Sequence, residues 1–218
     1  MVYPNAPWTL KGYGVQTVQM LDIKKVRPLI PAELEIVSVW PGKTLGGVYV
    51  ASYGAGSVLQ YNELIVVSGL VSYAGHWGAW ISHIYVDNAD SMAGGRDIWG
   101  LPKQLAEFRW EENSVRVEKG NKQLFSLVWK NSLLPVPVGL QLPFNGPVIS
   151  SWDNNFLLFK GDFGTRLGLV DAKVEIPAES EFFDLGLNAP TLTVYCDELR
   201  LVAGVPEMIG EKKVAYGY

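Results

Sequence analysis

The chain has 218 residues, of which 48% are apolar and 18% are charged, and its formal net charge is −4. This apolar content is sufficient for a substantial core, and 23 glycines with 13 prolines indicate many turns. The acidic balance and the lack of a long basic run argue against a nucleic-acid surface, and no apolar stretch reaches the roughly 18–20 residues of a membrane-spanning helix.

The cysteine content sets the expected compartment. Cys196 is the one cysteine of the sequence, which excludes an internal disulfide and a CxxC metal site and fits a reducing compartment. The first ten residues also lack the basic and apolar regions of a signal peptide. We therefore expect a cytoplasmic protein in which residues 1–218 form one domain.

The first part of the chain predicts one helix and a series of strands. A helix is expected over residues 22–30, because Asp22 can cap its start and Pro31 ends it. Apolar runs bounded by turn residues predict strands over residues 34–40, 45–54, 63–74 and 79–88. Gly69 is expected to bend the third of these strands. In the fourth, even-numbered residues from Trp80 to Val86 should share one face of the sheet.

Further elements follow in the second part of the chain. A short helix is expected over residues 88–100, capped by Asn88 or Asp90 and ended by Gly100. A half-exposed strand over residues 105–111 comes next. The remaining predictions are a hairpin over 115–129, a proline-rich crossover over 133–147, a hairpin over 156–176 that turns near residues 161–164, and a strand over 189–204.

These elements predict a mainly β fold of the β-rich α+β kind. Many short strands with only two helices are typical of a closed or sandwiched antiparallel sheet, whereas a doubly wound fold would need alternating strands and helices. The pattern itself specifies no ligand, so the residues that stand out chemically carry the functional question.

Several short motifs lack the partners that their functions require. The segment GAGSVL from Gly54 has no third glycine and no helix after it, and DFG at residues 162–164 has no kinase partners, so both are interpreted as turns. His76 and His83 do not have the spacing of metal ligands, so no metal site is expected. Cys196 lies within a predicted strand and is interpreted as a buried thiol.

Two charged residues stand beside strongly apolar sequence. Glu63 begins the apolar strand in YNELIVVSG, where a carboxylate facing water is the ordinary explanation. Lys103 follows a Leu-Pro corner in GGRDIWGLPKQLAEF, residues 94–108, and a solvated lysine is again the ordinary explanation. Position alone therefore leaves both residues open between a structural and a catalytic role.

The segment around Lys103 resembles the hallmark of the acetoacetate decarboxylase family, with Gly-Arg-acid, an aromatic or apolar pair, Pro-Lys and a leucine. DIKKVRPLIPAELEI, QYNELIVVSG and HIYVDNADSMAGGRD are similar to other parts of that family, so the resemblance covers roughly residues 13–110. The sequence also resembles a plant subgroup linked to neoxanthin accumulation. The family resemblance implies one antiparallel β-barrel-like domain, a homo-oligomer of at least two chains, and no metal or organic cofactor.

The resemblance also implies a reaction. Lys103 would form a Schiff base with a keto acid such as acetoacetate, and the iminium would act as an electron sink while carbon dioxide leaves. Protonation of the enamine and hydrolysis would then release a ketone. An ordinary lysine has a pKa of about 10.4 and is charged at neutral pH, so burial or a nearby cation must favour the neutral amine.

Other roles are carried over residue by residue. Glu63 matches the family's site carboxylate and would orient the substrate or transfer protons, while Arg96 would position the corner or tune the site. Lys11 is the cation nearest to the position of the family's substrate-carboxylate arginine. Trp99 and Leu101 are expected to form an apolar wall of the substrate pocket.

The chain departs from the best-known members at Gln104, where they carry a second lysine. We expect Gln104 to contact substrate, and desolvation of Lys103 to replace the effect of the missing charge. Two alternatives stay open: an aldolase or dehydratase acting on a larger keto acid, and a protein without turnover that binds an apolar lipid or isoprenoid ligand. A high aromatic content would suit the latter.

Overall fold

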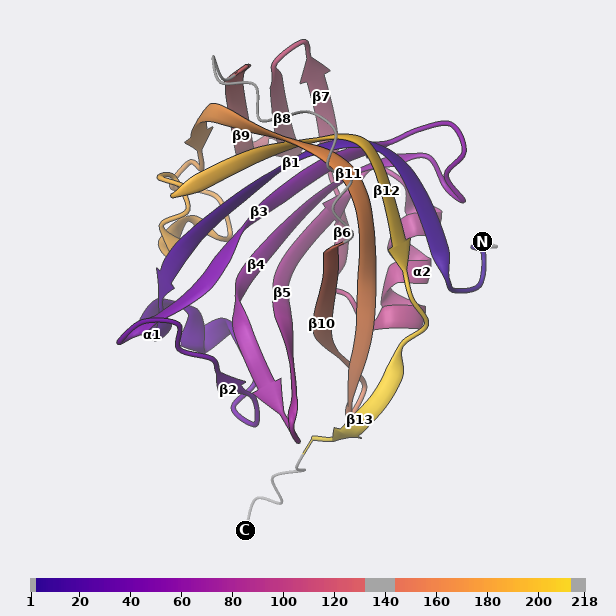
Figure 1. Cartoon of the computed structure of the whole chain (residues 1–218), viewed down its shortest axis with the longest axis vertical. Coiled ribbons are helices and arrows are strands. Elements are labelled where there is room, and N and C mark those ends of the chain that lie inside the picture. Colours follow the sequence, from indigo (N-terminus) through magenta and orange to yellow (C-terminus); the bar gives the residue numbers. More distant parts are fainter. Residues whose placement is uncertain (1–2, 132–143, 213–218) are drawn as a thin grey trace.

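The structure is a computed structural model and describes residues 3–131 and 144–212. Most of these residues belong to one curved sheet (Figure 1), in which strands pair in the order β10-β5-β4-β3-β1-β12-β11. Strand β10 also pairs with β11, which closes these strands into a barrel. Their bounds are β1 Trp8–Asp22, β3 Lys43–Tyr53, β4 Tyr61–Tyr73, β5 His76–Val86, β10 Phe144–Trp152, β11 Asn155–Glu175 and β12 Leu192–Ala203.

An antiparallel arm extends from the barrel. The second half of β11 pairs with β9, and β8 and β7 follow in order. Short strands β2, β6 and β13 pair with β4, β5 and β11. The mainly β fold is thus confirmed, although β10 and β6 both pair with β5 in parallel. The bounds are β2 Glu35–Ile36, β6 Lys103–Leu105, β7 Glu107–Glu111, β8 Ser114–Lys119, β9 Lys122–Asn131 and β13 Glu207–Glu211.

Two α-helices begin at the predicted caps. The side chain of Asp22 accepts a hydrogen bond from the Lys24 amide at α1 (Ile23–Val26), and Asn88 caps α2 (Ala89–Trp99) through the Ser91 amide. Single 3₁₀ turns occupy Arg27–Leu29 and Phe183–Leu185. None of the described helices is long and apolar enough to cross a membrane.

Strand β4 separates two apolar regions because its side chains alternate between the faces of the sheet. Leu64 and Val66 belong to the larger core cluster, which also contains residues of the arm such as Phe125. The opposite face of β4 points into the barrel, where Glu63 and Ile65 lie. The functional question therefore concerns the inner face of this strand.

Strand β5 corrects the predicted alternation. Val66 pairs with His83 and Val67 with Ile81, so Ser82 has no partner in the register. This extra residue is a β-bulge, which shifts the facing of the residues on either side. As a result Ile81 and Ile84, predicted on opposite faces, both line the barrel interior.

Two further predictions were wrong, one for a hairpin and one for the length of a strand. The segment predicted as a hairpin over residues 156–176 is the continuous strand β11, and the DFG segment lies within it. Gly161 and Gly164 are not among the glycines with positive φ, and β10 and β12 pair with β11 on either side, so no tight turn forms there. The strand predicted over residues 34–40 is reduced to Glu35–Ile36.

Other parts of the chain were not predicted or are not described. Strand β1 was not predicted, although it joins β3 to β12 in the barrel. Strand β13 was not predicted either. The proline-rich crossover predicted over residues 133–147 lies outside the described residues up to residue 143, and from Phe144 the chain forms β10.

Candidate active site

The corner before Lys103 is fixed by local backbone contacts. Gly100 ends α2 in the left-handed region at φ 61°, a conformation that glycine adopts without a steric penalty. The Arg96 guanidinium Nε donates a hydrogen bond of 2.7 Å to the Lys103 carbonyl oxygen. Lys103 then begins β6, which pairs with β5 at Ile84. Arg96 therefore holds the backbone of the corner rather than the amine.

Gly95 provides the space through which the Lys103 side chain passes. A Cβ atom at this position would lie only 2.4 Å from Lys103 Cδ, well inside van der Waals contact. Ser91 is one helical turn before Gly95 and receives a hydrogen bond of 3.1 Å from Lys103 Nζ at its Oγ atom. One face of α2 thus both accommodates and orients the lysine.

Lys103 and Glu63 form a buried ion pair. Lys103 Nζ lies 2.8 Å from Glu63 Oε1, and each side chain is only 4% exposed. The sheet brings them together because Glu63 pairs with Val86 of β5 and Lys103 pairs with Ile84 of the same strand. At this distance a proton can pass directly between the amine and the carboxylate.

Tyrosines surround the ion pair. Tyr53 donates a hydrogen bond of 3.2 Å to Glu63 Oε2, and Tyr61 donates a longer one of 3.5 Å to Oε1. Lys103 Nζ also lies 5.0 Å from the centre of the Tyr61 ring, a cation–π distance. Burial raises the pKa of Tyr53 and Tyr61 well above the ordinary value, and the Glu63 charge adds to this effect. Both hydroxyls therefore remain protonated donors at neutral pH.

The ion pair forms part of the lining of a cavity of about 270 Å³. Its walls are largely apolar and aromatic, and Trp8, Phe159 and Phe163 are among them. Glu63 and Lys103 are the charged side chains of this lining within the described part of the chain. The cavity is thus an apolar space with one amine and one carboxylate at its inner end.

The predicted substrate residues divide into two groups. Trp99 and Leu101 line the cavity, and Trp99 packs edge to face on Trp8 with ring centres 4.9 Å apart. Lys11 is exposed on β1 and is not part of the lining. Gln104 is not part of the lining either, and its Oε1 accepts a hydrogen bond of 2.5 Å from Lys119. Strand alternation explains this, since Lys103 points inward and the next residue points outward.

The tyrosines and Ser91 were not singled out from the sequence. Tyr61 precedes Glu63 by two residues, so both had to share a strand face, which was a usable signal. Tyr53 comes from β3, where it pairs with Tyr61, and that register could not be read from one sequence. Ser91 lies four residues before Gly95, a helical spacing that predicts a shared face.

The described residues contain no group of three or more His, Cys, Asp or Glu side chains that could hold a metal ion. Cys196 is buried in β12, as predicted, and burial raises the pKa of its thiol to about 11. Cys196 is not part of the cavity lining.

Comparison with known proteins gives the following matches. The family model described as acetoacetate decarboxylase (ADC) matches residues 3–151. The tomato (Solanum lycopersicum) protein NEOXANTHIN-DEFICIENT 1 is 33% identical over 106 residues, covering 49% of this chain and 36% of that protein. Acetoacetate decarboxylase 1 of Mesorhizobium japonicum is 29% identical over 107 residues, covering 48% of this chain and 40% of that protein. These matches span less than half the length of the two relatives.

Solved structures show the same fold at low sequence identity. An acetoacetate decarboxylase from Legionella pneumophila superposes with a TM-score of 0.72 at 16% identity, covering 97% of this chain and 90% of that one. The enduracididine biosynthesis enzyme MppR, complexed with pyruvate, superposes with a TM-score of 0.67 at 14% identity, covering 97% and 92%. At these identities the likeness concerns the fold.

Proposed function

This chain belongs to the acetoacetate decarboxylase family, and we propose that Lys103 forms a Schiff base with a carbonyl substrate, with keto-acid decarboxylation as the reaction. The observation that carries this proposal is the contact of 2.8 Å between Lys103 Nζ and Glu63 Oε1 at the inner end of an apolar cavity. A buried amine beside a proton acceptor is the arrangement that imine formation requires.

The first steps use both members of the ion pair. Glu63 accepts a proton from the Lys103 ammonium, and the neutral amine adds to the carbonyl carbon of the substrate. The nitrogen of the adduct passes one proton to the oxygen to give the carbinolamine. Glu63 then returns its proton to this hydroxyl group, which leaves as water and yields the iminium. Charge is conserved throughout, with one cation on nitrogen and one anion on Glu63 at the start and at the end.

Decarboxylation follows from the electron demand of the iminium. The bond between the α-carbon and the carboxylate breaks, its electron pair forms the enamine, and carbon dioxide leaves as a neutral molecule. The apolar lining assists this step, because a carboxylate is costly to bury and carbon dioxide is not. A proton taken up from solvent adds to the enamine carbon and restores an iminium. Water hydrolyses this iminium to the ketone and the Lys103 ammonium, which is the starting state.

The test is trapping with borohydride. The protein is incubated with acetoacetate or pyruvate, reduced, and analysed by intact mass and peptide mapping. The expected result is a secondary amine at Lys103, absent from Lys103→Met and retained in Lys11→Ala, since Lys11 lies outside the cavity. No adduct at Lys103 with any of a panel of keto acids and ketones would contradict the proposal.

A second candidate is aldol-type carbon–carbon chemistry on an uncharged carbonyl compound. One observation favours it: the described lining of the cavity has no cation besides Lys103. A keto acid brings a second anion next to Glu63, whereas an uncharged carbonyl leaves the iminium balanced by Glu63 alone. Adducts that form without release of carbon dioxide would select this reaction.

The assembly and the location of the protein are further proposals. The expected homo-oligomer of at least two chains and the cytoplasmic location stay predictions. MppR was solved in complex with pyruvate, which makes pyruvate a rational member of the substrate panel.

A further inference from the structure

The cavity above Lys103 continues as an apolar channel along β4 and β5. Ile84 lies beside Lys103 in the sheet register, and the same wall continues through Ile81 and Ala79 to Trp77. From Ile84 to Trp77 the strand advances seven residues, which corresponds to roughly 20 Å of chain at about 3.3 Å per residue. Because its lining extends over this whole distance, the cavity is elongated along β5.

The channel wall consists of apolar side chains that the protein itself covers only in part. On β4, Leu64 and Val66 face the larger core and are fully buried, whereas Ile65, Val67 and Leu70 face the channel and are only half-buried. Covering such side chains with an apolar ligand removes the rest of their surface from water. The wall therefore favours a hydrocarbon chain along its length.

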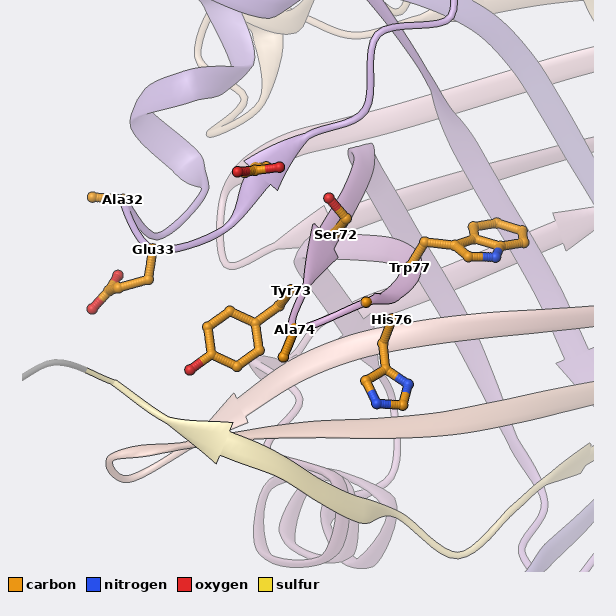
Figure 2. A pocket seen from close by; sticks show the side chains of 9 residues that line it. Ala32, Glu33, Ser72, Tyr73, Ala74, His76 and Trp77 are labelled. Carbon is orange, nitrogen blue, oxygen red and sulfur yellow. The ribbon is translucent and has the colours of Figure 1, made fainter.

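The outer end of the channel lies at Trp77. This side chain is 57% exposed and also borders an open groove lined by Glu33, Glu35 and His76. Figure 2 shows Trp77 and His76 pointing away from each other, although they are neighbours in β5. The two carboxylates of the groove repel a negatively charged group at this end of the channel, so a ligand that reaches it carries no negative charge there.

We propose that the Lys103 site takes a carbonyl compound with an unbranched apolar chain, whose carbonyl carbon lies at Lys103 Nζ and whose chain runs past Val67 toward Trp77. This inference rests on the proposed function and specifies its substrate class. A longer chain covers more of this wall, so the best-fitting substrates are those whose chain extends beyond Val67.

The first experiment is a chain-length series. The protein is incubated with 2-butanone, 2-hexanone, 2-octanone or 2-decanone, each at several concentrations, and trapped with borohydride. The concentration that gives half-maximal adduct at Lys103 should fall about fourfold per added methylene, because each buried methylene contributes a constant increment of binding.

Two variants test whether the channel is the cause. Val67→Phe places a bulky side chain midway along the wall and should reduce the ratio of 2-octanone to 2-butanone affinity at least tenfold. Val128→Phe is the matched control, since Val128 is half exposed on β9 of the arm and does not line the cavity.

The outcomes separate the two proposals. Adducts whose affinity rises with chain length in the wild type but not in Val67→Phe support the channel. Adducts with equal or falling affinity along the series overturn the channel and leave the Schiff base intact. If no ketone or keto acid is trapped, the Schiff base is overturned, and calorimetric binding of the same ketones decides the channel: affinity that rises with length supports it, and no such rise overturns it.

Discussion

Lys103 and Glu63 are buried as an ion pair, so removing either charge leaves the other without its partner in an apolar site. Lys103→Met leaves an unpaired carboxylate in an apolar site, and removing one partner of a buried ion pair costs about 3–5 kcal/mol. We expect the free energy of unfolding to fall by about this amount and to recover largely in Lys103→Met with Glu63→Gln. Urea denaturation of the wild type and the variants measures it, and additive losses would contradict the coupling.

Cys196 illustrates the opposite effect of burial on a reactive group. With the pKa of its thiol raised to about 11 by burial, the thiolate fraction at pH 8 is on the order of one thousandth. We expect alkylation by iodoacetamide to be much slower in the native protein than in urea. Mass spectrometry against time gives both rates, and equal rates would show that the thiol is accessible and ordinary.

At the residue scale, the sequence was informative where a charged residue stands beside strongly apolar sequence. Lys103 and Glu63 were identified by their place in a family pattern, and Trp99 and Leu101 by their nearness to Lys103. Tyr53 was missed because it reaches Glu63 across the β3–β4 register. Strand register depends on the whole sheet, so no local pattern around Tyr53 contains it.

At the scale of elements, α2 is shaped to the lysine that follows it. Gly95→Ala would place a Cβ atom 2.4 Å from Lys103 Cδ, and the side chain has little freedom to move because Glu63 and Ser91 hold its amine. We expect a loss of stability of about 1–3 kcal/mol, despite the better helix propensity of alanine. We also expect a lower rate of Schiff-base trapping.

Gly168→Ala is the matched control for this helix variant. Gly168 lies in β11, and a Cβ atom there would meet nothing within 4 Å. It should leave trapping unchanged. If Gly95→Ala also trapped substrate at the wild-type rate, the close approach between α2 and Lys103 would have no functional role.

Elements were predicted well where a local signal fixes them. The capping residues predicted where both helices begin. The long apolar run predicted β4, including its irregularity near Gly69. Strand β11 was misread because its glycines are typical of turns, and only its neighbours β10 and β12 keep the chain extended there. The bulge at Ser82 is likewise set by pairing with β4 rather than by β5 itself.

At the scale of the whole molecule, a polar cluster joins the arm to the barrel. Lys119 of β8 lies 2.7 Å from Glu181 and also binds Gln104, while Tyr85 of β5 donates a hydrogen bond of 3.0 Å to Glu181. The hydrogen bond from Lys119 lowers the pKa of Glu181 below its ordinary value of 4.5. The contact between Lys119 and Glu181 therefore stabilises the folded protein fully above the ordinary pKa of 4.5. This stabilisation is lost as the pH falls through the lowered pKa of Glu181.

This cluster predicts a pH-dependent effect of Glu181→Gln. The variant should lose at most about 1 kcal/mol of stability at pH 7, because the pair is partly exposed. The difference from the wild type should shrink as the pH falls toward 3. Urea denaturation at both pH values measures this, with Glu179→Gln, at a neighbouring exposed position, as control. A larger loss at pH 3 than at pH 7 would contradict the assigned sign.

Strand β11 has a consequence for how such a protein can evolve. Its first half closes the barrel and carries Phe159 of the cavity wall, and its second half carries the arm. A recombination event that exchanged the arm would have to cut this strand and break the wall beside the lysine. Arm and cavity are therefore inherited together, and changes in one are selected in the presence of the other.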